Sequence, residues 1–399
     1  MTDGNSALPV AIRTDGIFDG CRWQSGPVLI IVRGGVIAAI DRTGATPPAG
    51  LPVHHYPGAT VMPGLIDAHT HLAFSASAGP VAGLAGKSDS AIIRMMRKHA
   101  RSALVAGVTS LRDLGDFNFL TLVLRDEYAN RPAAGPHVVA AGPPITRADG
   151  HCAFLGCHAD TSGEIATRIA EHASRGTDLI KIMATGGMGA DPTSPQYTAA
   201  GLAVAVNAAR ESGLPITAHA HASASIADAV AAGVTGIEHC TFLTPTGIVR
   251  DDRLIDTLAE RNIFVGATVA RPRSGMPPSV LETLEPYWAN HTHMLLDRGV
   301  PVVCCTDAGI NSAKPHSILP SDIAYFATHV GTTAALSSAT ATAAHACGLG
   351  GRKGTLRPGY DADLLILPAN PTSDVAALLT PAAVYRLGHL MTRTQPTAL

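Results

Sequence analysis

The chain has 399 residues and a formal net charge of −2; 46% of its residues are hydrophobic and 15% are charged. It contains no basic patch, so nucleic acid is not an expected partner, and no apolar run is long enough to cross a bilayer. The seven scattered cysteines, and an N-terminal segment without a secretory pattern, indicate free thiols in a reducing compartment. We therefore expect a cytoplasmic protein without a membrane partner, whose large apolar fraction is compatible with a homo-oligomer.

Short strand-like runs occupy both ends of the chain. Residues 28–40 form two apolar runs separated by Gly34 and Gly35, a pattern typical of a β-hairpin. Near the other end, residues 363–367 form an apolar run before a proline-containing break, and residues 383–389 form another. We predict that residues 1–62 and 358–399 pair into one small β domain, and that residues 63–357 form a separate domain.

Between these ends, strand-like runs alternate with amphipathic helical stretches. The predicted strands are Gly64–His69, Val108–Asp113, Val138–Gly142, Leu179–Met183, Ile216–His219, Gly236–His239, Phe264–Thr268 and Val302–Thr306. The predicted helices include Ser90–Ala106, Glu164–Arg175, Ala199–Ser212, Ser225–Ala232 and Asp252–Arg261. Eight strands alternating with helices indicate an α/β fold, and eight parallel strands close a (β/α)₈ TIM barrel. The alternative is an open doubly wound sheet, which should show a glycine-rich phosphate loop after its first strand; the sequence has none there.

Histidines gather at the predicted strand ends. His69 and His71 close the first strand, and because alternate residues of a strand share a face, both imidazoles project to the same side. The later strands carry further candidate metal ligands at or near their carboxyl ends. These are Lys181, His219 with His221, His239 and Asp307. The carboxyl ends of barrel strands meet at one mouth, and imidazole and carboxylate ligands suit Zn²⁺ or a similar divalent ion. His99, with basic neighbours on both sides, is instead expected on a solvated helix face.

Lys181 is unusual because it stands inside the apolar run Leu-Ile-Lys-Ile-Met. A charged lysine is costly there, and an ammonium group cannot ligate a metal ion. One interpretation is a lysine whose charge reaches solvent or is paired with a carboxylate. The other is a neutral amine that has captured CO₂ to form a carbamate, an anion that can bridge two metal ions. We favour the carbamate, because burial near cations lowers the pKa of a lysine.

Seven segments spread over nearly the whole chain resemble, in order, those of the amidohydrolase superfamily, and within it the imidazolonepropionase-like and prolidase-like (Xaa-Pro dipeptidase) branch. The segments are PGLIDAHTHL, GVTSLRDLG, IKIMATGG, QYTAAGLAVAVNAARESGLPITAHAHA, AAGVTGIEHC, CTDAG and GTLRPGYDADLLILPANP. The resemblance implies a (β/α)₈ barrel with a β-sandwich formed by the two termini. It also implies two zinc ions, or similar divalent ions, per subunit, bridged by a hydroxide and by a CO₂-derived carbamate on Lys181.

The same resemblance implies how the ligands are shared. His69 and His71 would hold the more buried metal ion with Asp307, and His219 and His239 would hold the other. The bridging hydroxide would attack the scissile carbonyl of a small-molecule substrate. Asp307 would take the proton as general base and pass it to the leaving amine as general acid.

Loops after the strands supply further candidates. His221, two residues past His219, would stabilise the tetrahedral oxyanion or orient the substrate. The candidate substrate-binding residues are His151, Tyr197, Arg271, Arg273 and His316. His151 follows a glycine, as in a Gly-His pair that faces the active site in relatives, although Asp149 and Ala222 stand where relatives often carry glycine. Tyr197 and either Arg271 or Arg273 would bind a substrate carboxylate.

Three functions remain to be separated. The first is a binuclear zinc-dependent amidohydrolase that cleaves an amide bond in a small substrate, such as an Xaa-Pro-type dipeptide or an N-acyl amino acid. The second is a mononuclear cyclic-amide hydrolase or deaminase; relatives of that kind usually lack the lysine at position 181. The third is a non-catalytic barrel protein, and such relatives usually lose ligands, whereas this chain keeps all six.

Overall fold

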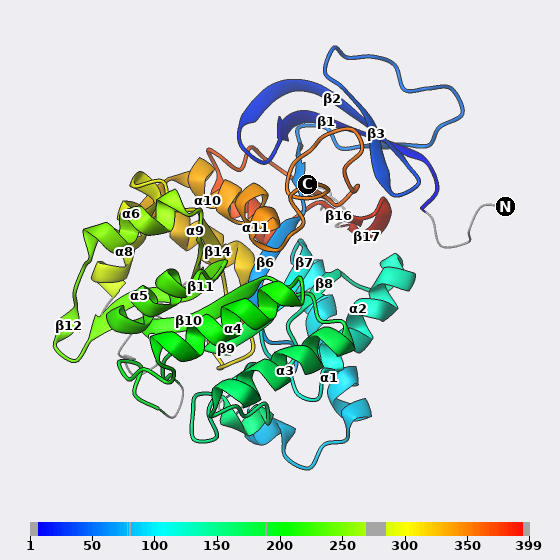
Figure 1. The fold of residues 1–399 in the computed structure, drawn as a ribbon. Coiled ribbons are helices and arrows are strands. Elements are labelled where there is room, and N and C mark those ends of the chain that lie inside the picture. Colours follow the sequence, from blue (N-terminus) through cyan, green and yellow to red (C-terminus); the bar gives the residue numbers. More distant parts are fainter. Residues whose placement is uncertain (1–6, 78, 80, 188–189, 269–284, 394–399) are drawn as a thin grey trace.

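A computed structural model describes residues 7–77, 79, 81–187, 190–268 and 285–393. A barrel of parallel strands surrounded by helices lies beside a sheet that both ends of the chain form (Figure 1). The predicted α/β fold, a (β/α)₈ TIM barrel with a terminal β-sandwich domain, is confirmed. The predicted domain boundaries stay predictions. No helix in the described ranges is long and apolar enough to span a membrane.

Eight strands form the terminal sheet, in the order β17-β16-β15-β5-β1-β2-β3, with β4 beside β1. Their bounds are β1 Val10–Phe18, β2 Trp23–Arg33, β3 Val36–Asp41, β4 Val53–His55, β5 Thr60–Pro63, β15 Leu364–Leu367, β16 Ala383–Arg386 and β17 His389–Arg393. Strand β5 pairs parallel with β1 and antiparallel with β15, so it joins the two ends of the chain. Ile12 and Ile30 are opposite each other across β1 and β2 and lie in the buried core of this sheet.

Eight parallel strands form the barrel. Their bounds are β6 Leu65–Thr70, β7 Val108–Asp113, β8 His137–Ala140, β9 Ile180–Met183, β10 Ile216–Ala222, β11 Gly236–Thr244, β13 Phe264–Thr268 and β14 Val302–Cys305. The ring closes through two single parallel bridges, one between Thr70 and Ala308 and one between Ile145 and Ile182. Strands β10 and β11 continue beyond their predicted ends, and the short β12 (Gly247–Ile248) folds back on β11.

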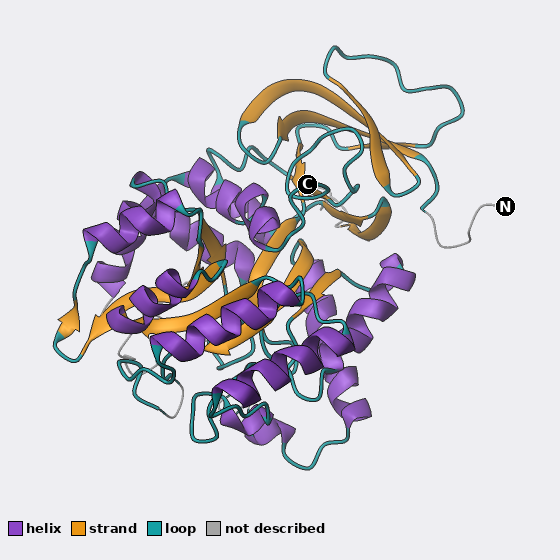
Figure 2. Cartoon of the chain, viewed as in Figure 1, coloured by secondary structure: helices purple, strands orange, loops and turns teal. Residues whose placement is uncertain are grey.

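Helices cover the outside of the barrel strands, as Figure 2 shows. Their bounds are α1 Asp89–Val105, α2 Leu120–Asn130, α3 Ser162–Arg175, α4 Ala199–Glu211, α5 Ser223–Ala232, α6 Asp252–Glu260, α8 Glu285–Asp297, α9 Leu319–Val330, α10 Thr332–Ser338 and α11 Ala341–Ala346. Helix α3 begins with a capping box: Thr161 Oγ1 accepts the amide hydrogen of Glu164, whose carboxylate accepts that of Thr161.

Burial on both faces sets the character of the barrel strands. Every residue of β6, β7, β9 and β10 is buried, because side chains fill the interior and helices cover the exterior. A polar side chain on such a strand needs a partner or a function. Asp67 has a partner, since its carboxylate accepts hydrogen bonds from the amide and the hydroxyl of Thr306 and so joins β6 to the end of β14.

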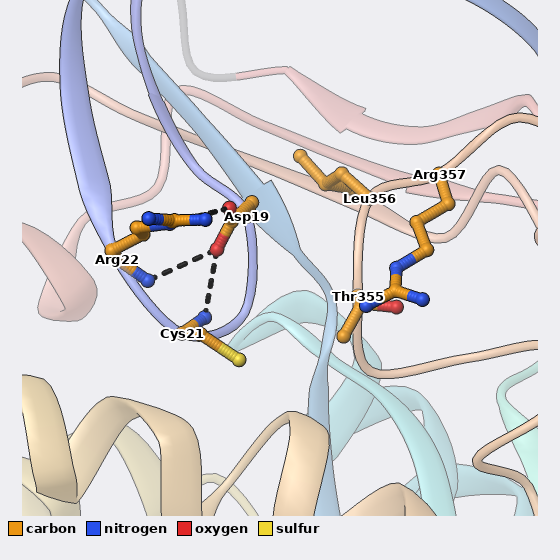
Figure 3. A pocket seen from close by; sticks show the side chains of 6 residues that line it. All are labelled: Asp19, Cys21, Arg22, Thr355, Leu356 and Arg357. Atoms are coloured by element: carbon orange, nitrogen blue, oxygen red, sulfur yellow. Dashed lines mark hydrogen bonds and ion pairs between the residues drawn. The ribbon is translucent and has the colours of Figure 1, made fainter.

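A small pocket lies between the turn joining β1 to β2 and the loop before β15 (Figure 3). Its lining residues are Asp19, Cys21, Arg22, Thr355, Leu356 and Arg357. The Asp19 carboxylate accepts the amide hydrogens of Cys21 and Arg22 and thereby closes the turn. No lining residue belongs to the predicted ligand set, so this pocket is not the predicted metal site.

A buried ionic network ties the terminal sheet to the loop before β15. Lys353 contacts the carboxylates of Asp361, at 2.7 Å, and Asp363, and Arg386 Nη1 lies 3.1 Å from Asp363 Oδ1. Burial alone would raise the pKa of Asp363, but Arg386 and Lys353 outweigh it and hold the pKa below its usual range. A carboxyl of this kind stabilises the fold above its unfolded pKa, and that stabilisation is lost as the pH falls toward the folded pKa.

Asp363→Asn should therefore lower the free energy of unfolding by about 3 kcal/mol at pH 7, because it leaves two buried cations without their shared carboxylate. Below about pH 4 the difference from the wild type should shrink, because the carboxyl of the unfolded chain then takes up a proton while the folded carboxyl does so only at lower pH. Urea unfolding at several pH values measures both quantities. A difference that does not depend on pH, or no loss at pH 7, would contradict this role for Asp363.

Candidate metal centre

The carboxyl ends of the barrel strands bring the predicted ligands together. His69 lies on β6, and His71 follows directly after it; both side chains are buried. Two main-chain hydrogen bonds fix this segment against the end of β14: the Asp307 amide donates to the oxygen of His69, and the His71 amide donates to the oxygen of Ala308. The barrel closure at Thr70 and Ala308 is therefore also what positions these three side chains.

His69 and His71 converge on one carboxylate. Nε2 of His69 lies 3.4 Å and Nε2 of His71 lies 3.1 Å from Oδ1 of Asp307. The other ring nitrogens are occupied, because His71 Nδ1 donates to the main-chain oxygen of Gly115 at 3.0 Å and His69 Nδ1 lies 2.9 Å from Glu238 Oε2. A carbonyl oxygen only accepts, so in neutral His71 the lone pair is on Nε2 and faces Asp307.

A second group of imidazoles lies beside the first. One ring nitrogen each from His219, His221 and His239 lies within 4.8 Å of the others, and His239 also belongs to a group with His69 and Asp307. The ring centroids of His219 and His239 are 4.6 Å apart, and those of His69 and His239 are 5.3 Å apart. His239 thus stands between the two groups.

Lys181 on β9 lies in the same interior. Its side chain is 1% exposed, and within the described ranges it makes neither a hydrogen bond nor an ion pair. Burial lowers the pKa of the ammonium group, although Glu238 and Asp307 act in the opposite direction. The geometry therefore gives this amine neither the solvent nor the paired carboxylate of the simpler interpretation.

The electrostatics of the site favour neutral imidazoles around ionised carboxylates. Burial, together with neighbouring imidazoles, lowers the pKa values of His219 and His239 well below the usual value. Burial would raise the pKa of Asp307, but His69 and His71 outweigh it and keep the carboxyl ionised. The pKa of His71 is raised, because contact with Asp307 exceeds the effect of burial, so a proton and a metal ion would compete for Nε2.

Two of the predicted ligands have a strained backbone. His239 and Asp307 have φ angles of +72° and +58°, a left-handed conformation that residues other than glycine rarely adopt. Such a conformation costs roughly 1–3 kcal/mol per residue and is typical of functional sites. His239 lies within β11 and Asp307 comes just after β14, and at both positions the unusual φ sets the direction of the ligand side chain.

Two charged residues behind the site escaped the sequence analysis. Glu238 and Arg112 are buried, with Arg112 Nη2 2.9 Å from Glu238 Oε1, and Thr217 Oγ1 donates to the same oxygen at 2.8 Å. The other carboxylate oxygen of Glu238 holds His69. Gly266 leaves the space, since a Cβ there would lie 2.1 Å from Glu238 Oε2. The available signal was a charged residue inside each of two predicted strands.

The predicted substrate-binding residues are only partly brought to the site. His151 is there, with its ring centroid 4.4 Å from that of His219. The hydroxyl of Tyr197 donates to the main-chain oxygen of Ala159. Arg271 and Arg273 lie outside the described residues. The roles of these four residues in substrate binding stay predictions.

His99 was predicted on a solvated helix face, but the structure places it against His316 and the loop after His71. His99 is half-buried, not solvated: its Nδ1 donates to the main-chain oxygen of Leu72, and its ring packs against that of His316 with centroids 4.3 Å apart. His316 is itself buried, and its Nε2 donates to the main-chain oxygen of Phe74. The loop after His71 folds over this face of α1, which the sequence does not show. Contact of His316 with substrate stays a prediction.

The residues present fit divalent metal ions. Five imidazoles and one carboxylate come together, each imidazole has one nitrogen already hydrogen-bonded, and the carboxylate is ionised. Nitrogen and oxygen ligands of this kind are those that Zn²⁺ and similar ions prefer. A neutral lysine beside them adds a group that can become an anion.

Comparisons with known proteins agree with this centre. Ochratoxinase from Aspergillus niger is 25% identical to the chain over 362 residues, which cover 81% of this chain and 73% of that protein. Imidazolonepropionase from Salinispora tropica is 27% identical over 389 residues, which cover 85% of each. The crystal structure of an Xaa-Pro dipeptidase with bound methionine superposes with a TM-score of 0.84 at 24% identity, covering 96% of this chain and 99% of that one.

The family model of the amidohydrolases matches residues 60–390, which include the whole barrel and every predicted ligand. The match therefore spans both the fold and the histidine-rich centre, and it agrees with the resemblance of the seven sequence segments. The chain belongs to the amidohydrolase family and is a metal-dependent hydrolase that acts on C–N bonds.

Proposed function

We propose that the protein is a binuclear zinc-dependent amidohydrolase that cleaves an amide bond in a small substrate, such as an Xaa-Pro-type dipeptide or an N-acyl amino acid. The observation that carries the proposal is the buried amine of Lys181, which has no hydrogen-bond or ion-pair partner among the described residues and lies beside two groups of side chains able to bind metal ions. Structures described as an Xaa-Pro dipeptidase and as a prolidase complexed with N-methylphosphonate-L-proline share the fold. The homo-oligomeric state and the cytoplasmic location stay predictions.

In this proposal Lys181 binds CO₂. The neutral Nζ attacks the carbon, a C–N bond forms, and one C=O electron pair moves to oxygen. The nitrogen then loses a proton to water, which leaves a carbamate anion. Burial supports the step because it favours the neutral amine that attacks, and two nearby cations would stabilise the anion that forms.

The chain's own residues then perform the proton transfers. Divalent ions bound at the centre would lower the pKa of a water molecule and polarise the scissile carbonyl. Asp307 is ionised and accepts the proton that the water loses, and it returns that proton to the leaving nitrogen, so the amine departs neutral. His69 and His71 lie against the Asp307 carboxylate and would share a bound ion with it. His151 is placed to contact the substrate near His219.

Hydrolysis of a library of dipeptides and N-acyl amino acids tests the substrate class. Zinc-loaded protein should release product from a subset of the library, chelation should abolish the release, and added Zn²⁺ should restore it.

Asp307→Asn should lower kcat by about 10³-fold, because the proton acceptor is lost. Elemental analysis of the active protein should give two ions per chain. One tightly bound ion per chain would favour the mononuclear cyclic-amide hydrolase or deaminase. No turnover by the wild type or by Asp307→Asn would favour the non-catalytic barrel.

The carbamate predicts a specific labelling result. Protein equilibrated with ¹³C-bicarbonate should show a carbamate ¹³C resonance that is absent from Lys181→Ala, and the variant should lose at least about 100-fold in kcat/KM. Lys87→Ala is the matched control, because it removes an exposed lysine and should keep both the resonance and the rate. A Lys181→Ala protein with two bound ions and full activity would refute the role of the carbamate.

Glu238 should act on the metal through His69. Glu238→Gln removes the anion that accepts the His69 Nδ1 hydrogen and leaves Arg112 without its carboxylate. We expect the affinity for the more buried ion to fall by about 10–100-fold, as for other hydrogen-bond partners of metal ligands. Competition with a zinc chelator measures it, and Glu260→Gln, an exposed change on α6, is the control. Unchanged zinc affinity in folded Glu238→Gln would show that Glu238 serves only the packing of the strands.

A further inference from the structure

His221 makes hydrogen-bonding contacts to Thr241 that are compatible with a hydrogen on its Nδ1. Its Nδ1 lies 2.9 Å from Thr241 Oγ1, and the same hydroxyl donates its single hydrogen to the main-chain oxygen of His221 at 3.4 Å. When that hydrogen points to the main-chain oxygen, Thr241 accepts from the ring, and Nδ1 carries the ring hydrogen. In the neutral ring Nε2 then holds a lone pair. This form can ligate a metal ion, but it has no hydrogen to give to an oxyanion.

The two neighbouring imidazoles are arranged in the same way. Nε2 of His219 donates to the main-chain oxygen of Gly186 at 2.9 Å, which leaves the lone pair on Nδ1. Nδ1 of His239 is bound to Thr268 Oγ1 at 2.8 Å, which leaves Nε2. Each ring thus has one nitrogen occupied by a different partner, and its other nitrogen has no hydrogen-bond partner among the residues that the structure describes.

The rings also lie at a distance suited to a shared ion. One nitrogen from each lies within 4.8 Å of the other two. Ligand atoms around a tetrahedral zinc ion stand roughly 3.3 Å apart, so small ring movements would complete the coordination. The His221 and His239 rings are stacked, with centroids 4.6 Å apart and planes 17° apart, and the His221 amide is held by Thr185 Oγ1. The main chain therefore keeps His221 turned toward the group.

We propose that His221 is the third imidazole ligand of the second metal site, with His219 and His239, and is not the donor to the oxyanion. The assignment rests on the proposed function in one respect, namely that a second divalent ion lies at this group. It deepens that function, because an ion with three imidazole ligands stays bound when Lys181 carries no carbamate. Loss of CO₂ would then stop hydrolysis without releasing the metal.

Metal titration of His221→Ala tests the assignment. Competition between the protein and a chelator, with Zn²⁺ and with Co²⁺, should show at least about 100-fold weaker binding of one ion, and the other should change by less than about twofold. The visible absorption of Co²⁺ at the affected site should change as well. His54→Ala is the control: it also removes a hydrogen-bonded imidazole, but from β4 of the terminal sheet, and should leave both affinities unchanged.

A pair of variants at Thr241 separates ligation from general damage. Thr241→Val keeps the shape of the side chain but removes the acceptor, and should weaken the same ion by about 10-fold. Thr241→Ser keeps the hydroxyl and should restore wild-type affinity. Both results would show that the tautomer of His221 matters to the metal.

The assignment would be overturned if His221→Ala kept wild-type affinity for both ions and an unchanged Co²⁺ spectrum, even with hydrolysis lost. That pattern would return His221 to the oxyanion or to the substrate. A wild-type protein that hydrolyses none of the library would contradict the proposed function instead, and the Co²⁺ titration of His221→Ala would still decide whether His221 is a ligand. If the wild type binds a single ion, loss of that ion in His221→Ala supports the assignment. Retention of the ion in this variant contradicts the assignment.

Discussion

The hydrogen bond at the remote nitrogen of each imidazole is the interaction on which the metal centre depends. A neutral histidine can carry its lone pair on either ring nitrogen. The hydrogen-bond partner of the other nitrogen sets which of the two carries it. In this barrel the partners are main-chain oxygens for His71 and His219, a carboxylate for His69, and threonine hydroxyls for His221 and His239. The second nitrogens of His69 and His71 lie against Asp307, and ring nitrogens of His219, His221 and His239 lie within 4.8 Å of one another.

Three energetically unfavourable features accompany this arrangement of ligands. Ionised Glu238 and Arg112 are buried behind His69, and a residue without a side chain, Gly266, is needed to make room for them. The φ angles of His239 and Asp307 lie in the left-handed region. The amine of Lys181 is held away from solvent with no hydrogen bond among the described residues. Unfavourable terms of this kind gathered at one end of a barrel indicate function rather than packing.

The sequence is informative where the physical rule is local. Strand alternation places His69 and His71 on one face whatever their neighbours are, and a barrel of eight strands brings their ends together. The pairing of Arg112 with Glu238 depends on which strands meet across the interior, so the only local signal was a charged residue inside each predicted strand. The half-buried state of His99 depends on the path of a loop, for which periodicity gives no rule. Tautomers and substrate contacts are equally non-local, and the comparisons show the family but not the substrate.

Anomalous diffraction at the zinc edge, from crystals of the zinc-loaded protein, tests the account most directly. The account predicts two peaks inside the barrel mouth, one between His69, His71 and Asp307 and the other between His219, His221 and His239, with continuous density from Lys181 toward both. A single peak, or peaks away from these side chains, would contradict it.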